Sequence, residues 1–164
     1  MLTTLVRYEK VKDLYAEIAR SKWTEALEGR VFENTKGYFI SPSIIDNPPE
    51  DSRIVVEEPF GPVVPVLRWS SEQDVLERAN NGKDGLGASV WSNDLVRAEK
   101  MARELSAGSV WINSHFDVAP NVPFGGHKWS GLGTEWGLSG LKQYCNSRSL
   151  WKWKKPMGAS GQKA

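Results

Sequence analysis

The sequence has too little cysteine and histidine for a disulfide framework or a typical metal centre. Its 164 residues include one cysteine, Cys145, and two histidines, His115 and His127. One cysteine cannot form an internal disulfide or a cysteine-based zinc cage, and two histidines do not suffice for a histidine-rich site. We therefore expect no metal, and the low cysteine content is typical of a reducing compartment.

Long apolar runs and an excess of charge are also missing. The mean hydropathy is −0.45, and no apolar run approaches the roughly 18 residues that a membrane span requires. The N-terminal stretch turns charged by Arg7, unlike a secretory signal. Lys and Arg number 21 against 20 Asp and Glu, and the one basic cluster, Lys152, Lys154 and Lys155, is too small for a phosphate-binding surface. We expect a cytoplasmic protein that binds neither membrane nor nucleic acid.

The chain is instead rich in tryptophan, with eight such residues. Tryptophan combines a large apolar face with one N–H donor, so these residues indicate either an aromatic core, which is the simpler explanation, or an aromatic binding surface. The length favours a single folded domain. We expect this domain to cover residues 1–153, followed by a disordered tail over residues 154–164.

Apolar residues recur at helical spacing in several segments. The clearest is residues 7–21, where Val11, Leu14, Tyr15 and Ile18 share one face. Three more helices are predicted: one opened by Ser71 and Asp74 and closed by Asn81-Gly82, one capped by Ser92 or Asn93 with Gly108 as its left-handed C-cap, and one over residues 138–144.

Extended segments alternate with these helices. They are predicted at residues 38–45, 63–69, 88–91, 109–113 and 150–153, the first of them interrupted by Pro42. This order predicts an α/β fold with a mainly parallel sheet and flanking helices. Residues 114–133 are rich in proline and glycine without periodicity, and an ordered loop of this length is often functional.

Four motifs together resemble the aldehyde dehydrogenase superfamily. They are Gly37-Tyr-Phe-Ile-Ser-Pro-Ser-Ile-Ile45, Glu57-Glu-Pro-Phe-Gly-Pro-Val63, Gly108-Ser-Val-Trp-Ile-Asn113 and Pro123-Phe-Gly-Gly-His-Lys-Trp-Ser-Gly131. The resemblance runs from about Tyr8 to Trp153 and covers the C-terminal, catalytic-domain-like portion of such an enzyme. It implies the α/β fold of that domain without the coenzyme domain.

The resemblance also indicates which parts of the family's chemistry are not in this sequence. The family places its nucleophilic cysteine in a Gly-Gln-x-Cys segment and its general base in a Glu-Leu-Gly-Gly-Lys segment, and neither segment occurs here. No glycine-rich turn suited to a pyrophosphate is found either. Cys145 follows Gln143-Tyr144 near the end of the chain, where a small apolar or surface role is expected. We expect a truncated aldehyde dehydrogenase-like protein that binds no cofactor and has lost NAD-dependent oxidation.

Several residues match positions with a role in the family. Glu58 resembles the carboxylate that binds the ribose beside the nicotinamide, and Phe60 the aromatic residue beneath that ring, although this turn could equally serve to start a core strand. Asn113 and Phe124 resemble the wall of the substrate channel. Together with these, the aromatic residues Phe60, Trp111, Phe116, Phe124 and Trp129 are expected to form an apolar pocket wall.

Four titratable residues are the candidates for any surviving chemistry: Glu58, His115, Asp117 and His127. His115 and Asp117 could act as an acid/base pair if they touch, although residues two apart on a loop can equally be two solvated side chains. No thiol nucleophile is expected beside them.

Two classes of function remain open at this point. The first is a non-redox protein that binds a small carbonyl compound or a protein partner. The second is a repurposed enzyme, an isomerase, cyclase or dehydratase, that acts on a reactive carbonyl or polyketide-like compound in a specialised biosynthetic pathway. In either case we expect a homodimer or higher homo-oligomer, with Trp151 or Trp153 near the contact, because an unpaired strand at residues 150–153 invites another chain.

Overall fold

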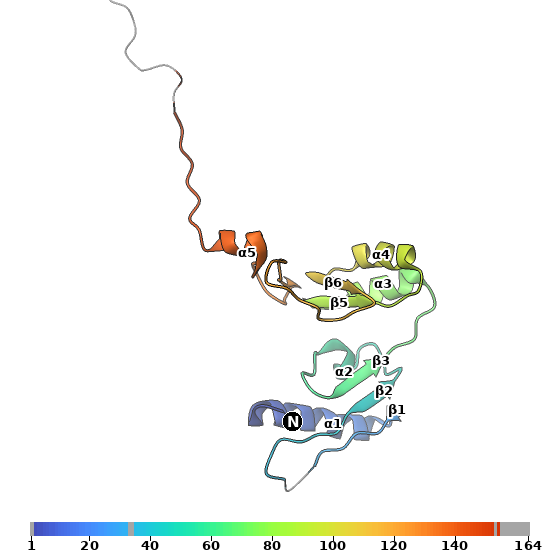
Figure 1. Cartoon of the computed structure of the whole chain (residues 1–164). Coiled ribbons are helices and arrows are strands. Elements are labelled where there is room, and N and C mark those ends of the chain that lie inside the picture. Colours follow the sequence, from blue (N-terminus) through green and yellow to red (C-terminus); the bar gives the residue numbers. More distant parts are fainter. Residues whose placement is uncertain (1, 33–34, 153, 155–164) are drawn as a thin grey trace, which may run out of the picture. The chain divides into compact units, whose positions relative to one another are not determined.

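Two compact units, divided after Gly82, make up the chain in the computed structural model (Figure 1). The structure describes residues 2–32, 35–152 and 154. Most of the predicted tail, residues 155–164, therefore lies outside the described residues. Each unit is a separate cluster of contacts. The prediction that residues 1–153 fold as one domain requires the two units to fold and unfold together, and it stays a prediction.

Helix α1 (Leu5–Ser21) organises the first unit. Thr4 caps it, because its side chain accepts a hydrogen bond from the N–H of Arg7. The helix buries the four residues at helical spacing, Val11, Leu14, Tyr15 and Ile18. The predicted helix over residues 7–21 is thus confirmed, with two further residues at its start.

A three-stranded sheet packs with α1. Strands β1 (Thr24–Leu27) and β2 (Ser43–Asp46) are antiparallel, and β2 and β3 (Val63–Val66) are parallel, with Ser43 opposite Val63. Ile45, Ile54 and Val63 join the buried face of α1 in one core. Two short helices complete the unit, α2 (Arg53–Val56) and α3 (Glu72–Asn80).

The capping prediction for α3 is confirmed. The Ser71 side chain accepts a hydrogen bond from the N–H of Asp74, and Asn81 ends the helix. The extended segment that was expected over residues 63–69 is shorter, because strand pairing stops at Val66. Strand β1 was not predicted, since Thr24–Leu27 shows no alternation of apolar and polar residues.

The hydroxyl of Tyr15 ties α1 to the sheet. It lies 2.8 Å from the carbonyl oxygen of Ser41 and 3.0 Å from that of Pro62, and both oxygens act as acceptors. Burial, and secondarily the charge of Glu25, raises the pKa of Tyr15 to about 12. The folded unit therefore holds this proton more tightly than the unfolded chain, whose tyrosines titrate near pH 10.

We expect this tyrosine to make the first unit sensitive to alkali. The stabilisation is complete below about pH 10 and is lost as the pH rises through about 12, at about 1.4 kcal/mol per pKa unit. Tyr15→Phe should lower the free energy of unfolding by about 1–3 kcal/mol at neutral pH, because two partly buried carbonyls lose the hydroxyl donor that they share. The substitution should also reduce the fall in the free energy of unfolding between pH 10 and 12. Tyr144→Phe, at an exposed site, is the control, and equal alkaline losses in all three proteins would contradict the assignment.

The second unit is built on a parallel pair of strands. Strands β5 (Gly87–Val90) and β6 (Ser109–Ile112) run parallel with Ser89 opposite Trp111. Helix α4 (Leu95–Glu104) connects them and packs along both. A second, antiparallel pair joins β4 (Asp84–Gly85) to β7 (His127–Lys128), and α5 (Gly137–Gln143) follows. Helices and sheets thus form the predicted α/β fold, with antiparallel pairs beside the expected parallel ones.

The ends of α4 differ from the prediction. Asp94, not Ser92 or Asn93, is the N-cap, because its side chain accepts the N–H of Arg97. Ser92 instead accepts the N–H of Asp94. The helix ends at Glu104, with Leu105 as its C-cap, and Gly108 has no left-handed backbone.

Gly108 is required for a different reason. A Cβ built on it would lie 1.7 Å from the carbonyl oxygen of Gly125, so the start of β6 passes directly against the Gly125-Gly126 turn. Only a residue without a side chain permits this approach.

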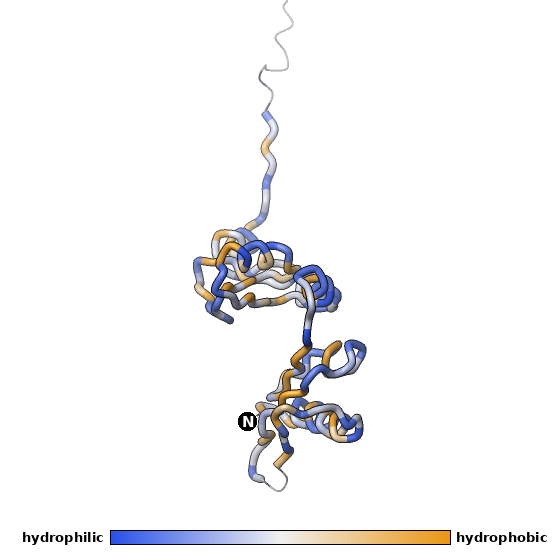
Figure 2. Tube along the Cα trace, turned by 90° about the vertical axis from the view of Figure 1, so that its right-hand side faces the viewer, coloured by the Kyte–Doolittle hydropathy of each residue, from blue (hydrophilic) through white to orange (hydrophobic). Residues whose placement is uncertain are grey.

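The predicted final strand is wrong for its described part. Residues 150–152 form no strand pairing, and Trp153 lies outside the described residues. Leu150 and Trp151 are 89% and 93% exposed. Figure 2 shows the extended path of the chain after α5, with apolar and polar residues in turn.

Candidate functional site

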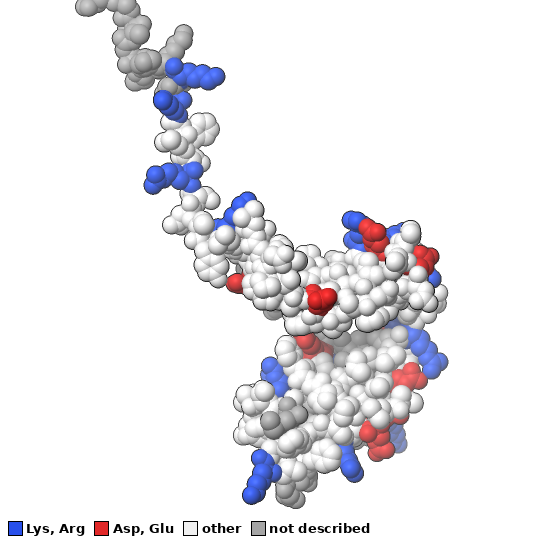
Figure 3. Space-filling view, in the orientation of Figure 1, with Lys and Arg blue, Asp and Glu red and all other residues white. Residues whose placement is uncertain are grey.

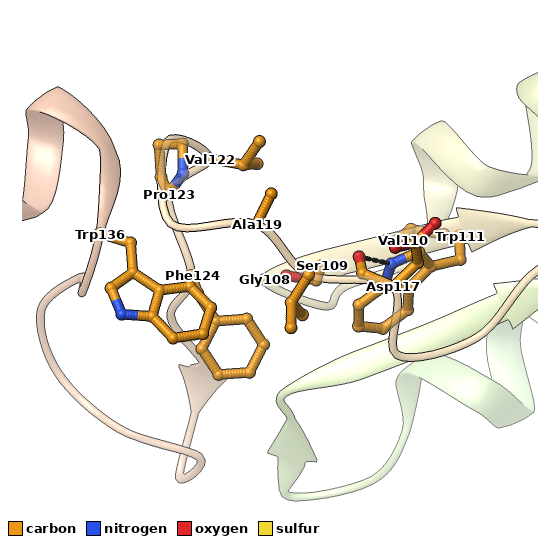
Figure 4. A pocket seen from close by; sticks show the side chains of 11 residues that line it. Gly108, Ser109, Val110, Trp111, Asp117, Ala119, Val122, Pro123, Phe124 and Trp136 are labelled. Atoms are coloured by element: carbon orange, nitrogen blue, oxygen red, sulfur yellow. Dashed lines mark hydrogen bonds between the residues drawn. The ribbon is translucent and has the colours of Figure 1, made fainter.

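A cavity of about 200 Å³ lies in the second unit, between β6 and the loop that follows it. Most of the side chains that line it are apolar, although polar and apolar atoms share its accessible wall about equally, and Figure 4 shows these side chains. The lining residues are Gly108, Ser109, Val110, Trp111, Asp117, Val118, Ala119, Val122, Pro123, Phe124 and Trp136. An apolar cavity of about 150 Å³ is known to hold benzene, so this volume suits a ligand built on one ring.

Aromatic rings follow one another along this wall. The ring centroids of Trp111 and Phe116 are 6.1 Å apart, those of Phe116 and Phe124 6.2 Å, and those of Phe124 and Trp136 5.6 Å. These spacings lie in the range of favourable aromatic pairs. Each ring therefore helps to fix the next. Trp111, Phe124 and Trp136 line the cavity, whereas Phe116 contacts the first two of these rings from outside the lining.

Hydrogen bonds hold the loop in place around the cavity. The indole N–H of Trp111 donates to the carbonyl oxygen of Asp117 at 2.7 Å. Phe124 and Glu135 exchange two backbone hydrogen bonds, of 2.8 and 2.7 Å, which bring Trp136 to the wall. Phe116 and Trp136 have left-handed backbones, with φ of 57° and 60°. Such backbone strain persists only where the surrounding structure enforces it, so the loop has one defined conformation.

The predicted acid/base pair does not form. Among the described residues, no hydrogen bond or ion pair joins His115 to the carboxylate of Asp117. Nδ1 of His115 instead lies 2.6 Å from the hydroxyl oxygen of Ser89. Asp117 lines the cavity, whereas His115 lies outside its lining and packs its ring against the edge of Trp111.

Asn113 acts as a clamp rather than as a cavity wall. Its side-chain oxygen accepts the N–H of Ser92 and its amide nitrogen donates to the Ser92 carbonyl, both at 2.8 Å. Its backbone is left-handed, with φ of 54°, which asparagine tolerates better than most residues. Asn113 thus joins the ends of β5 and β6.

Three other predicted residues, Phe116, His127 and Trp129, lie outside the cavity lining. His127 is exposed on β7, opposite Gly85. Trp129 is 83% exposed, with its backbone N–H donating to the carbonyl of Lys83. Trp136 takes the place on the wall that was expected for Trp129. It was missed because its position depends on the pairing of Phe124 with Glu135, for which the sequence carries no local signal.

Glu58 and Phe60 belong to the first unit, where they do not present a nicotinamide site. The guanidinium of Arg7 lies over the ring of Phe60, 4.3 Å from its centroid. Glu58 lines a small hollow of about 100 Å³ together with three basic residues, Arg7, Lys10 and Arg53. The hydrogen bonds that the Arg53 guanidinium donates to the carboxylates of Asp13 and Glu57 raise the pKa of Arg53. A cation thus lies over one face of the Phe60 ring, and its positive charge disfavours a cationic nicotinamide ring beside it.

The single thiol is not part of the cavity. Cys145 is exposed just after α5, with its sulfur 3.7 Å from the Leu141 carbonyl, in agreement with the surface role predicted for it. Over the described ranges, no group of three potential ligands could hold a metal ion. None of the described helices is both long enough and apolar enough to cross a membrane.

Comparison with known proteins shows the family to which this α/β unit and its Pro-Phe-Gly-Gly segment belong. The model of the aldehyde dehydrogenase family matches residues 2–150. The chain belongs to the aldehyde dehydrogenase family.

Individual relatives agree with this assignment. The chain is 45% identical over 122 residues to the putative aldehyde dehydrogenase FUS7 of Gibberella fujikuroi, which covers 74% of this chain and 26% of that protein. It is 39% identical over 144 residues to aldehyde dehydrogenase 1A1 of Oryctolagus cuniculus, covering 88% of this chain and 29% of that protein. The NAD+ complex of an aldehyde dehydrogenase from Bacillus cereus matches with a TM-score of 0.85 and 38% identity, covering 94% of this chain and 31% of that one.

The chain thus spans about a quarter to a third of the length of these relatives. The α/β fold and the resemblance to part of an aldehyde dehydrogenase are confirmed. What this part does by itself is a separate question, which the cavity addresses.

Proposed function

We propose that this chain binds a small, uncharged carbonyl compound in the ring-lined cavity and does not itself oxidise it. The observation that carries this proposal is the presence of three aromatic rings in the cavity lining, those of Trp111, Phe124 and Trp136, the last two with centroids 5.6 Å apart. Small-molecule sites typically combine such an apolar wall with a few polar groups. The only cysteine, Cys145, is not among the lining residues, so the cavity contains no thiol to attack the carbonyl.

The polar groups of the lining favour a neutral ligand. Ser109 supplies a hydroxyl that can donate to a carbonyl oxygen. Asp117 supplies the one acidic side chain of the wall and disfavours an anion there. Figure 3 shows that the visible surface of this unit away from α4 carries few charges. A carboxylic acid, the oxidised product of an aldehyde, is therefore expected to bind more weakly than the aldehyde.

Calorimetric titration with benzaldehyde, in the absence of coenzyme, tests the proposal. We expect saturable binding with one site per chain, and binding of benzoate at least about tenfold weaker. Ser109→Ala should weaken the binding of benzaldehyde, whereas Ser139→Ala, on the exposed side of α5, should not. Equal affinity for aldehyde and acid would contradict the proposed lining.

The same protein should not reduce coenzyme. With NAD and benzaldehyde together we expect no formation of NADH above background, and calorimetry should detect no micromolar binding of NAD, because Arg7 covers Phe60. Steady NADH formation by the purified chain would overturn this half of the proposal.

We also infer that the chain forms a homodimer through its C-terminal segment. The sequence-based argument for a contact through an unpaired strand does not apply, since residues 150–152 form no strand. The nearly complete exposure of Leu150 and Trp151 still supports a contact, because adjacent large apolar side chains seldom remain in water. Light scattering at tens of micromolar should give a dimer, and Trp151→Ser should give a monomer. A wild-type monomer under these conditions would refute the inference, and Trp69→Ser, in the first unit, is the control.

A further inference from the structure

A serine and a histidine meet outside the cavity. The Ser89 hydroxyl oxygen lies 2.6 Å from Nδ1 of His115, a short contact for a hydroxyl hydrogen bond. Neither residue lines the carbonyl cavity, so what this pair does is separate from the function proposed above. A hydroxyl that donates to an imidazole nitrogen is the arrangement that activates a serine nucleophile.

Strand β5 holds Ser89 on a rigid support. Ser89 is half-buried in the middle of the strand, opposite Trp111 of β6. Because side chains alternate across a strand, Ser89 and Trp111 lie on the same face of the pair. Gly87 precedes them on that face, and the Trp111 ring occupies the space next to it, where a Cβ would come within 2.8 Å.

The loop fixes the imidazole of His115. Its ring meets the edge of Trp111, with centroids 5.4 Å apart and the planes at 68°. Two left-handed residues flank it, Asn113 and Phe116, and the hydrogen bonds of Asn113 to Ser92 anchor the start of the turn. Strained backbone of this kind concentrates at functional sites.

The free edge of β5 supplies a backbone donor beside the serine. The N–H of Ser109 donates to the Leu86 carbonyl and that of Asn113 to the Val90 carbonyl, so the even-numbered residues of β5 bond to β6. The N–H of Ser89 therefore points to the opposite edge, with which no strand pairs in the described part of the chain. It is available to an oxygen that becomes negatively charged near the Ser89 hydroxyl.

We propose that Ser89 is a nucleophile and His115 its general base, and that the pair transfers acyl groups from small activated esters. Ser89 Oγ forms a bond to the ester carbonyl carbon while its proton passes to Nδ1 of His115. The bond from this carbon to the leaving oxygen then breaks, and the leaving group takes the proton from Nδ1. In the second half, water attacks the acyl carbon and gives its proton to Nδ1. The Oγ–carbon bond breaks, Oγ recovers the proton and the free acid leaves.

Hydrolysis of p-nitrophenyl acetate tests this assignment. Ser89→Ala and His115→Ala should each lower kcat/KM by at least about a hundredfold. Cys145→Ser is the matched control, because it removes the one exposed thiol that could hydrolyse the same ester. The Cys145→Ser protein should keep the wild-type rate, and hydrolysis that disappears with Cys145 but survives in Ser89→Ala would overturn the proposal.

Labelling of the unaltered chain gives a test that does not depend on the folding of a variant. A fluorophosphonate exchanges its fluoride for the oxygen of an activated serine. We expect one adduct, on the peptide that contains Ser89, and no adduct in His115→Ala. Labelling absent from that peptide, or equal in His115→Ala, would contradict the assignment. The benzaldehyde titration is unaffected by either result, because the cavity lining does not include this pair.

Discussion

Gly108→Ala is expected to unfold the second unit. The added Cβ would lie 1.7 Å from the carbonyl oxygen and 2.7 Å from the carbonyl carbon of Gly125, and both obstacles are backbone atoms that cannot rotate away. The start of β6 and residues Gly125-Gly126 would have to separate, which also displaces Gly108 and Ser109 of the cavity lining. We expect a loss of about 4 kcal/mol or more in the free energy of unfolding, the range of the most severe single substitutions.

Chemical denaturation followed by tryptophan fluorescence measures this loss. Gly82→Ala is the matched control, since a Cβ at Gly82 meets no atom within 4 Å. Its effect should stay within about 0.5 kcal/mol. If the two alanine variants unfold at the same denaturant concentration, the close approach of β6 to Gly125 is wrong.

Phe124→Ala is expected to damage both the stability of the second unit and its ligand affinity. The Phe124 ring stands between those of Phe116 and Trp136, so its removal breaks two aromatic contacts and leaves a void in the wall. We expect the unfolding free energy to fall by about 3 kcal/mol. The affinity for benzaldehyde should fall at least tenfold, because the ring is part of the cavity lining.

Trp129→Ala gives the contrast for this prediction. Trp129 was expected from the sequence to belong to the same wall, but its side chain is 83% exposed and lies outside the lining. Its removal should change neither stability nor affinity appreciably. A loss of affinity in Trp129→Ala as large as in Phe124→Ala would favour the sequence-based wall over the one in the structure.

Local patterns predicted the helices well and the short strands poorly. The spacing of Val11, Leu14 and Ile18 reports burial on one helix face, which depends only on residues of the same segment. Strands β1 and β7 carry no such pattern, since their residues are mostly exposed and pair with partners far along the chain. In the segment at residues 150–152, by contrast, a strand was predicted that does not form. Its alternating residues are typical of a strand, but no described strand lies beside it.

The candidate site was predicted in part for the same reason. Trp111 and Phe124, which the sequence analysis assigned to one wall, both line the cavity. The sequence brought His115 and Asp117 together by their spacing, yet the turn at Phe116 directs them to different surroundings. Ser89 was not considered, because its contact with His115 spans 26 residues and follows only from the pairing of β5 with β6.

The indole N–H signals of the chain offer the most direct test of carbonyl binding. Two tryptophans line the cavity, Trp111 and Trp136, and five others are described elsewhere, Trp23, Trp69, Trp91, Trp129 and Trp151. In a ¹H–¹⁵N spectrum of the coenzyme-free protein titrated with benzaldehyde, we predict saturable shifts of the Trp111 and Trp136 signals, with the five others unmoved. Absence of any shift, or shifts confined to tryptophans outside the cavity, would contradict the proposal that this cavity binds a carbonyl compound.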